Sequence, residues 1–367
     1  MAYVAVKGGT ESIEQSIQHV EYERIKSGKQ IDVDKIEAGM RGMIDQVMSE
    51  SSMYSETLAA LAIKQAEGNM EEAVFLLRAH RSTIPRNYYT RTVESQDMQV
   101  ERRISASFKD IPGGQILGAT YDYSHRLLNF NLLTETNEDI QQIKSAFEQL
   151  NDDYNSEELP EQLPKVVDYL RDEGLFSYYE NNETEPSDIT KQSLQFPTNR
   201  SERLQILTRG QTGAVTALGY AAIRGYGSVH PTVGELRVGH LPITISVEDE
   251  KDEDDYYIGK IKVTEVESFI PITVKNDQHE EEIEFEIGYG ICFGQNETKA
   301  IAMSILDQAL EHPSKEFPTH DEEFVLLHID SVEATGFISH LKLPHYVTFQ
   351  SKLDRVREIK QGEKGNE

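Results

Sequence analysis

Two histidines near the end of the chain have the residue type and spacing to hold a metal ion. His340 and His345 are separated by the residues Leu-Lys-Leu-Pro. Pro344 disfavours helical geometry at the residue before it, so we expect the pair on an extended or turn segment. Neutral imidazole is a common zinc ligand, and the pair therefore indicates half of a metal site. The alternative is two packed or solvated histidines, because two ligands do not complete a site.

The segment from Glu101 to Leu128 is dense in side chains that suit an anionic ligand. Its basic residues could pair with phosphate oxygens, and they are Arg102, Arg103, Lys109 and Arg126. Gly113 and Gly114 form a Pro-Gly-Gly turn whose backbone amides could approach an anion closely. Acid–base capacity is supplied by Asp110, Asp122 and His125. The alternative is a turn whose arginines pair with local acids.

Two further glycine-rich segments could approach a ligand. Residues 224–237 combine three glycines with the polar side chains of Arg224, His230, Glu235 and Arg237. Loops of this kind often carry ligand-binding groups, although a simple turn is the alternative. Residues 288–294 lead into a helix whose N-terminus could receive an anion. A plain strand-to-helix turn is the alternative there, since Glu297 in the first helical turn would oppose an anion.

The composition excludes several classes of protein. The chain has 64 acidic and 36 basic residues and a net charge of −28, which disfavours binding to nucleic acid. No apolar run is long enough for a membrane span, and the first residues lack a secretory pattern, so we expect a cytoplasmic protein. The single cysteine, Cys292, rules out a disulfide within the chain and is expected to be a buried, inert thiol.

The hydrophobic pattern predicts an α+β fold. We expect an N-terminal helical bundle with a short strand at Tyr3–Val6, and a C-terminal antiparallel sheet packed with helices. The sheet is a β-meander of strands at 234–247, 256–267 and 282–293, because the loops between them are too short for helical crossovers. Further helices are expected at 138–150, 163–172, 297–311, 321–333 and 349–359.

Four domain ranges follow from these elements. Residues 1–133 form a mainly helical domain that includes the Arg-rich block, and 134–200 an acidic connector. Residues 201–360 form an α+β domain with the histidine pair, and 361–367 a disordered tail.

Long ordered motifs in this chain resemble the PhnI family of carbon–phosphorus lyase complex subunits. The most specific are KDIPGG and YDYSHRLL within residues 101–128, and SHLKLPHYV at 339–347. Shorter blocks that also match lie at Ala5–Gly9, Leu58–Ala66, Phe75–Ala79, Arg224–Gly227, Gly288–Gly290 and Asp321–Val325. The resemblance spans most of the chain and is weakest in the acidic stretches at 134–160 and 248–255.

This resemblance implies a role in bacterial phosphonate catabolism. Family members resemble a nucleosidase acting on purine nucleoside triphosphates such as ATP and GTP. With the subunits PhnG, PhnH and PhnL they act as a transferase, moving C1′ of the ATP ribose onto a phosphonate such as methylphosphonate. The products are ribose 1-methylphosphonate 5-triphosphate and adenine. The resemblance also implies a dimer at the core of a hetero-oligomer that includes PhnJ, a radical iron–sulfur lyase, and PhnK.

The resemblance places a metal ion, zinc or a similar divalent metal, on His340 and His345, and Mg²⁺ would accompany ATP. Breaking the glycosidic bond passes through a cationic transition state that Asp110, Asp122 or Glu235 could stabilise. His125 or His230 could protonate adenine, and the 101–126 cations could bind the triphosphate. A non-catalytic metal-binding scaffold for PhnJ is the alternative, and an independent metal-dependent hydrolase is a third possibility.

Overall fold

A computed structural model describes residues 9–107, 109–154, 163–176, 178, 184–226, 230–246, 255–275, 281–342 and 346–364. The strand predicted at Tyr3–Val6 and the ligand candidate His345 lie outside these residues. The chain divides into two compact units. The helical unit comprises residues 1–84, 209–214 and 323–367, and the sheet unit comprises 85–208 and 215–322.

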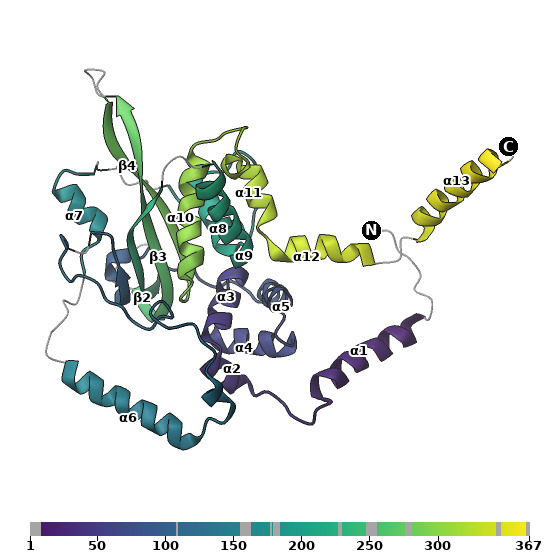
Figure 1. The fold of residues 1–367 in the computed structure, drawn as a ribbon, viewed down its shortest axis with the longest axis horizontal. Helices are drawn as coiled ribbons and strands as arrows, with labels where there is room; N and C mark the ends of the chain where they lie inside the picture. Colours follow the sequence, from purple (N-terminus) through teal and green to yellow (C-terminus); the bar gives the residue numbers. More distant parts are fainter. Residues whose placement is uncertain are drawn as a thin grey trace. The chain divides into compact units, whose positions relative to one another are not determined.

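The helical unit confirms the predicted N-terminal bundle (Figure 1). Its first helices are α1 (Gly9–Ile25), α2 (Val33–Gly39), α3 (Arg41–Ser51), α4 (Glu56–Gln65) and α5 (Met70–Thr83). Apolar residues at helical spacing on α3, α4 and α5 form its core, with Met48, Ala59 and Val74 fully buried. The Asn69 side chain caps α5 by accepting a hydrogen bond from the Glu72 amide at 3.0 Å.

The single helix predicted over 321–333 is wrong, because Asp330 starts a new one. The structure has α11 (Glu322–His328) and α12 (Ser331–Ser339), followed by η6 (His340–Lys342) and α13 (Tyr346–Lys364). The Asp330 carboxylate accepts from the amides of Val332 and Glu333, which makes it the N-cap of α12. Arg78 holds Asp330 in place through a 2.6 Å ion pair.

The sheet unit confirms the predicted β-meander and the α+β class. The strands are β1 (Gln99–Ile104), β2 (Thr232–Ser246), β3 (Asp255–Lys275) and β4 (Glu281–Phe293), and they pair antiparallel in that order. Two features were not predicted. The Arg-rich segment supplies β1, and β3 continues eight residues beyond Glu267.

Helices cover this sheet on both faces (Figure 1). Helix α7 (Val166–Asp172) packs on β2, and α10 (Glu297–Glu311) packs on β3 and β4. The chain between Ser95 and His320 also contains α6 (Asn137–Tyr154), α8 (Arg200–Arg209) and α9 (Thr212–Ala221), with short turns η1 (Ser95–Asp97), η2 (Phe130–Leu133), η3 (Ala222–Tyr226) and η5 (Pro318–His320). Helix α10 buries Met303 and Leu306. Cys292 on β4 is buried, as predicted.

The boundaries of the two compact units differ from the domain ranges predicted from the sequence, because residues 323–367 group with residues 1–84. Those ranges stay a prediction about which parts fold independently. Helix α13 extends to Lys364 and thus includes the start of the tail predicted at 361–367. Among the described helices, none has the length and apolar character needed to cross a membrane.

Candidate active site

One face of the sheet carries a buried lattice of charged side chains. Arg103, Arg237 and Glu265 lie opposite one another on β1, β2 and β3. In the next row, Glu235 lies opposite Glu267, which lies opposite Tyr289 on β4. Residues directly opposite in a sheet share a face, as do residues two apart on one strand. The strand pairing therefore brings these six polar side chains together.

Short ion pairs connect the lattice. Arg103 Nε lies 2.7 Å from Glu235 Oε1, and Arg237 Nη2 lies 2.6 Å from Glu265 Oε2. Lys165, just before α7, brings its Nζ to 2.5 Å from Glu267 Oε1 and 3.3 Å from Glu265 Oε1. The three carboxyl groups thus lie beside three cations, and this pairing offsets the free-energy cost of burying charged groups.

The pKa values of the two carboxyl groups on β3 are shifted in opposite directions. Burial opposes ionisation of Glu265, but the charges of Arg237 and Lys165 outweigh it and lower its pKa to about 2. Burial raises the pKa of Glu267, and the Glu265 charge adds to that rise while Lys165 opposes it. The Tyr289 hydroxyl donates to Glu265 Oε1 at 2.9 Å, and its pKa is raised by burial and by the Glu265 charge. Paired groups with divergent pKa values are typical of acid–base sites.

Replacing Glu265 should remove part of the acid sensitivity of folding. A carboxyl whose folded pKa is about 2, against 4.5 ordinarily, stabilises the fold above pH 4.5 and loses that contribution as the pH falls toward 2. The contribution is roughly 3 kcal/mol at the usual conversion. Glu265→Gln should therefore flatten the dependence of the unfolding free energy on pH between 4.5 and 2, measured by urea titration. The pKa of Glu267 is raised, so its contribution to the unfolding free energy changes only above pH 4.5. It therefore does not obscure the effect of Glu265 between pH 4.5 and 2.

The matched control is Glu284→Gln, which changes an exposed glutamate on β4 and should keep the wild-type slope. If Glu265→Gln also kept that slope, the ion pairs of Glu265 would not be stabilising its charge.

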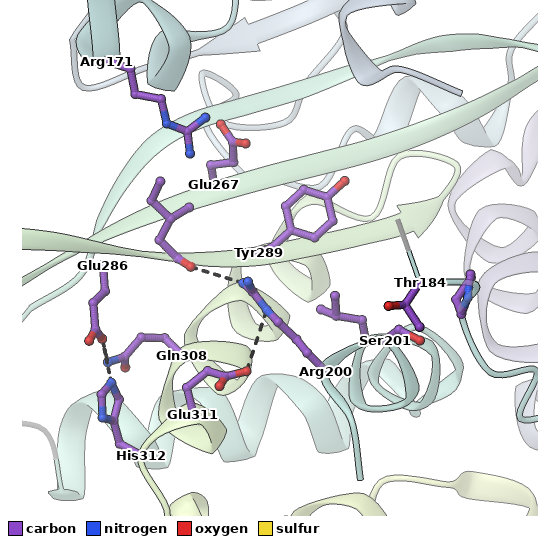
Figure 2. Close-up of a pocket in the computed structure, with 13 residues that line it drawn as sticks. Arg171, Thr184, Arg200, Ser201, Glu267, Glu286, Tyr289, Gln308, Glu311 and His312 are labelled. Carbon is purple, nitrogen blue, oxygen red and sulfur yellow. Dashed lines mark hydrogen bonds and ion pairs between the residues drawn. The ribbon is translucent and has the colours of Figure 1, made fainter. Parts of the chain in front are cut away.

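A cavity of about 880 Å³ opens beside the lattice, along the edge strand β4 (Figure 2). Its polar wall consists of Arg171, Thr184, Arg200, Ser201, Glu267, Glu286, Tyr289, Gln308, Glu311 and His312. Pro186, Leu204 and Ile287 supply apolar surface. Cavities of this size commonly hold small ligands.

Side-chain pairs hold the cavity wall in place. Arg200 forms two hydrogen bonds with the Asp307 carboxylate, at 3.1 and 2.6 Å, and Asp307 also accepts from the Tyr289 amide on β4 at 2.9 Å. Glu286 Oε2 lies 2.7 Å from His312 Nε2 and 2.8 Å from Gln308 Nε2. Figure 2 shows Glu286 on β4, Arg200 on α8 and Gln308 on α10 in this wall.

Two buried polar atoms of the lattice lack a hydrogen-bond partner among the described residues. They are Glu267 Oε2 and Arg237 Nη1. Such atoms are costly unless something satisfies them, and in a cavity wall a ligand is a natural partner. Glu267 and Tyr289 are lattice residues that also line the cavity.

The structure brings together some of the residues predicted as functional. Arg103 and Glu235, from two separate predicted clusters, form one buried ion pair. The other nitrogens of Arg103 donate to the carbonyls of Pro112 and Pro164 at 2.8 and 2.9 Å. Arg102 is also buried, donating to the Leu117 carbonyl and pairing with Asp122 at 2.6 Å and Glu297 at 3.0 Å. Both arginines therefore have their charge compensated inside the protein.

The remaining predicted residues lie mostly at the surface, and none of them lines the cavity. The exposed ones are Lys109, Asp110, Asp122, His125, Arg126, Arg224 and His230. The Asp122 carboxylate, which pairs with Arg102, also lies 4.0 Å from the Arg126 guanidinium. Gly113 and Gly114 have φ of 83° and 56°, which glycine adopts without strain, so the predicted turn forms. No bound ligand tests the roles of these residues, which stay predictions.

The sequence reasoning missed Lys165, Glu265, Glu267 and Tyr289. The available signal was VTEVESF, in which two glutamates stand two positions apart in a predicted strand. A strand places such residues on one face, so the pattern predicts that the two carboxyl groups are neighbours, although it does not predict that they are buried.

His340 lies in the helical unit, at the start of η6. Its Nδ1 contacts the Phe337 carbonyl oxygen, which can only accept, and the neutral tautomer that suits this contact has its lone pair on Nε2. This is the form in which histidine binds a metal. Among the described residues, no three His, Cys, Asp or Glu side chains gather as a metal site, and His345 is outside them. The residue present fits a ligand role, and the metal stays a prediction.

Comparison with known proteins identifies the family. Residues 2–363 match the family described as bacterial phosphonate metabolism protein (PhnI). This chain belongs to the PhnI family. It is 42% identical over 370 residues to the alpha-D-ribose 1-methylphosphonate 5-triphosphate synthase subunit PhnI of Escherichia coli (strain K12), covering 98% of each chain. It is 41% identical over 373 residues to the PhnI protein of the same description from Rhizobium meliloti (strain 1021), covering 98% of this chain and 95% of that one. The PhnI resemblance seen in the motifs is confirmed.

Proposed function

We propose that this chain is a subunit of a phosphonate-degrading carbon–phosphorus lyase system and acts in a ribosyl transfer. With partner subunits of the kinds PhnG, PhnH and PhnL, it moves the ribose 5-triphosphate of ATP onto methylphosphonate and releases adenine. By itself it has the activity of a purine nucleoside triphosphate nucleosidase. The names of the two relatives support the ribosyl transfer, since both are called subunits of the alpha-D-ribose 1-methylphosphonate 5-triphosphate synthase.

The single structural observation that carries the proposal is the carboxyl pair Glu265 and Glu267 beside the β4 cavity. Glycosyl transfer needs a negative charge near the cationic sugar and an acid for the leaving group. In this lattice Glu265 is held ionised, whereas burial favours protonation of Glu267. These opposite pKa shifts favour one ionised and one protonated carboxyl group, the combination that the reaction uses.

The predicted residues take more specific parts in this proposal. Arg103 and Glu235 position the lattice, because they are enclosed and paired with each other. The exposed cations Lys109, Arg126 and Arg224 lie on the surface of the sheet unit and suit the triphosphate with its Mg²⁺. His125, His230, Asp110 and Asp122 are exposed acid–base groups that could act at the same surface.

The experiment that tests the proposal is incubation of the purified protein with ATP or GTP, followed by chromatography for the free base. Release of adenine or guanine supports the nucleosidase activity. The absence of base, both alone and with the partner subunits, would contradict it and favour the scaffold alternative.

We also propose that His340 binds a divalent metal such as zinc, together with His345. His340→Ala should lose most of the bound metal, measured by elemental analysis of the purified protein. The matched control is His328→Ala. His328 has the same local arrangement, with Nδ1 2.6 Å from the carbonyl oxygen of Phe324 and its ring against that phenylalanine, but it lies outside the motif. Full metal content in His340→Ala would contradict the ligand role.

The scaffold alternative makes the metal structural and removes the chemistry from this chain. It predicts that His340→Ala weakens assembly with the PhnJ-type subunit and that no variant of the sheet unit affects base release. The catalytic proposal is favoured because Glu267, one member of the buried carboxyl pair, lines the cavity and has an oxygen without a hydrogen-bond partner among the described residues.

A further inference from the structure

We propose that Glu267 is the acid that protonates the departing purine, and that the cavity along β4 receives the purine ring. This inference rests on the proposed function and names the part of the substrate that the cavity binds. It is carried by the position of Glu267, by its unpaired oxygen and by the chemistry of the cavity wall.

The two oxygens of Glu267 have different surroundings. Oε1 is held by Lys165 Nζ at 2.5 Å, which fixes the side chain. Oε2 is buried and has no hydrogen-bond partner among the described residues, and the side chain is 9% exposed. Because Glu267 lines the cavity, a ring nitrogen of a bound ligand is a suitable partner for Oε2. The oxygen that is not needed for the fold is thus left for the ligand.

The charge of the wall suits a neutral ring more than a triphosphate. Two arginines of the wall could face a phosphate, and both have carboxylates beside them. Asp307 and Glu311 lie 2.6 and 3.9 Å from the Arg200 guanidinium. Asp168 lies 3.1 Å from that of Arg171. Glu286 adds another carboxylate to the wall. Several carboxylates in one cavity repel a polyanion. The triphosphate therefore lies elsewhere, and the sugar–base end enters.

The cavity wall offers groups that suit both the faces and the edge of a purine ring. Leu204 and Ile287 offer apolar contact for the ring faces. Gln308 and Glu286 offer a donor and an acceptor for the ring edge, and the 880 Å³ volume accommodates a purine with part of its ribose.

The chemical step balances with the proposed reaction. The bond between C1′ and the purine nitrogen breaks, and its electron pair stays on the purine. The Glu267 carboxyl proton moves to a purine ring nitrogen, which makes the departing base neutral. An oxygen of the phosphonate forms the new bond to C1′. In simple hydrolysis a water oxygen forms this bond, and the proton that the water loses passes to solvent. The Glu267 carboxylate is stabilised by Lys165 and then regains a proton from solvent.

The groups around Glu267 set the direction of the pH dependence. Charged and titratable groups surround Glu267 from every element packed against it. They are Lys165 just before α7, Arg171 on α7, Glu235 and Arg237 on β2, Glu265 on the same strand, Tyr289 on β4, Arg200 on α8 and Glu311 on α10. Burial and the Glu265 charge raise the pKa of Glu267 while Lys165 opposes them, so activity should fall as the pH rises through that pKa.

The test is Glu267→Gln, assayed for base release from ATP in the complex with the partner subunits. The expected kcat is at least about 100-fold lower, since general acid catalysis supplies at least that factor, with little change in KM. The alkaline fall in the pH profile should disappear. Replacing a side chain that has only a structural role would not remove the alkaline fall from the pH profile. Glu284→Gln, an exposed glutamate on the same strand as Tyr289, is the control and should behave as wild type.

A second variant keeps the inference testable if Glu267→Gln fails to fold. Leu204→Trp adds bulk to the cavity at a residue that is not part of the lattice. It should raise KM for ATP and weaken binding of free adenine by about tenfold or more, as loss of about 1.4 kcal/mol of binding would. A folded Leu204→Trp with wild-type KM and adenine affinity would overturn the cavity assignment. A folded Glu267→Gln with wild-type kcat and pH profile would overturn the acid assignment. If the wild-type complex released no base at all, the proposed function would fail first, and the two failures are thus distinguishable.

Discussion

Arg103→Ala should lower the free energy of unfolding by about 3–5 kcal/mol, because it leaves the buried Glu235 carboxylate without its cation. Arg103 is 0% exposed, and its side chain also donates to two backbone carbonyls. Removal therefore breaks an ion pair and leaves buried acceptors without donors. Urea denaturation followed by circular dichroism measures the loss.

Two comparisons separate this effect from general loss of charge. Arg126→Ala removes a cation from the same segment whose side chain is 68% exposed, and should change stability by less than about 0.5 kcal/mol. The double variant Arg103→Met with Glu235→Leu removes both charges and should recover part of the stability lost in Arg103→Ala. If Arg103→Ala were as stable as wild type, the lattice would not be a structural requirement of the sheet unit.

Gly288→Ala should destabilise the sheet unit by at least about 1–3 kcal/mol, the usual effect of overpacking a core. A Cβ built on Gly288 would overlap the backbone carbonyl oxygen of Ser304 on α10, and one on Gly290 would overlap that of Ala300. A backbone oxygen cannot move out of the way as a flexible side chain can, so α10 would have to shift. Thermal unfolding measures the effect.

This shift should also reach the cavity, because α10 carries Gln308 and Glu311 of its wall and is followed directly by His312. KM for ATP should therefore rise in any Gly288→Ala protein that still folds. Gly42→Ala is the control, since a Cβ there meets nothing within 4 Å, and it should keep wild-type stability. An unchanged melting temperature in Gly288→Ala would contradict the close packing of α10 on β4.

The glycines of β4 illustrate what the sequence could and could not predict. Residues 288–294 suggested an anion site at a helix N-terminus, and the helix does begin at Glu297. The structure shows that Gly288 and Gly290 allow α10 to approach the strand. A glycine pattern predicts that something comes close, but which element does so depends on pairing between distant parts of the chain.

The charged lattice was harder to predict for the same reason. The strands β2, β3 and β4 were predictable from short loops and alternating apolar residues, because these are local signals. Arg103 meets Glu235 only because β1 adds to the sheet from 132 residues away, and Lys165 arrives from the segment before α7. Charged residues in a strand suggest solvent exposure when the strand is considered alone. Their burial becomes plausible only when the opposite charges are known to lie across from them.

The measurement that tests the central claim most directly is product analysis of the purified chain with its partner subunits, ATP and methylphosphonate. Chromatography would quantify adenine, and ³¹P nuclear magnetic resonance would follow the methylphosphonate signal. We predict one adenine released for each methylphosphonate converted to a ribose 1-phosphonate ester that keeps the triphosphate. Glu267→Gln should slow both products equally. If ATP and methylphosphonate stayed unchanged in the complete assembly, with the wild-type chain folded, the chain would not be the ribosyl-transferring subunit proposed here.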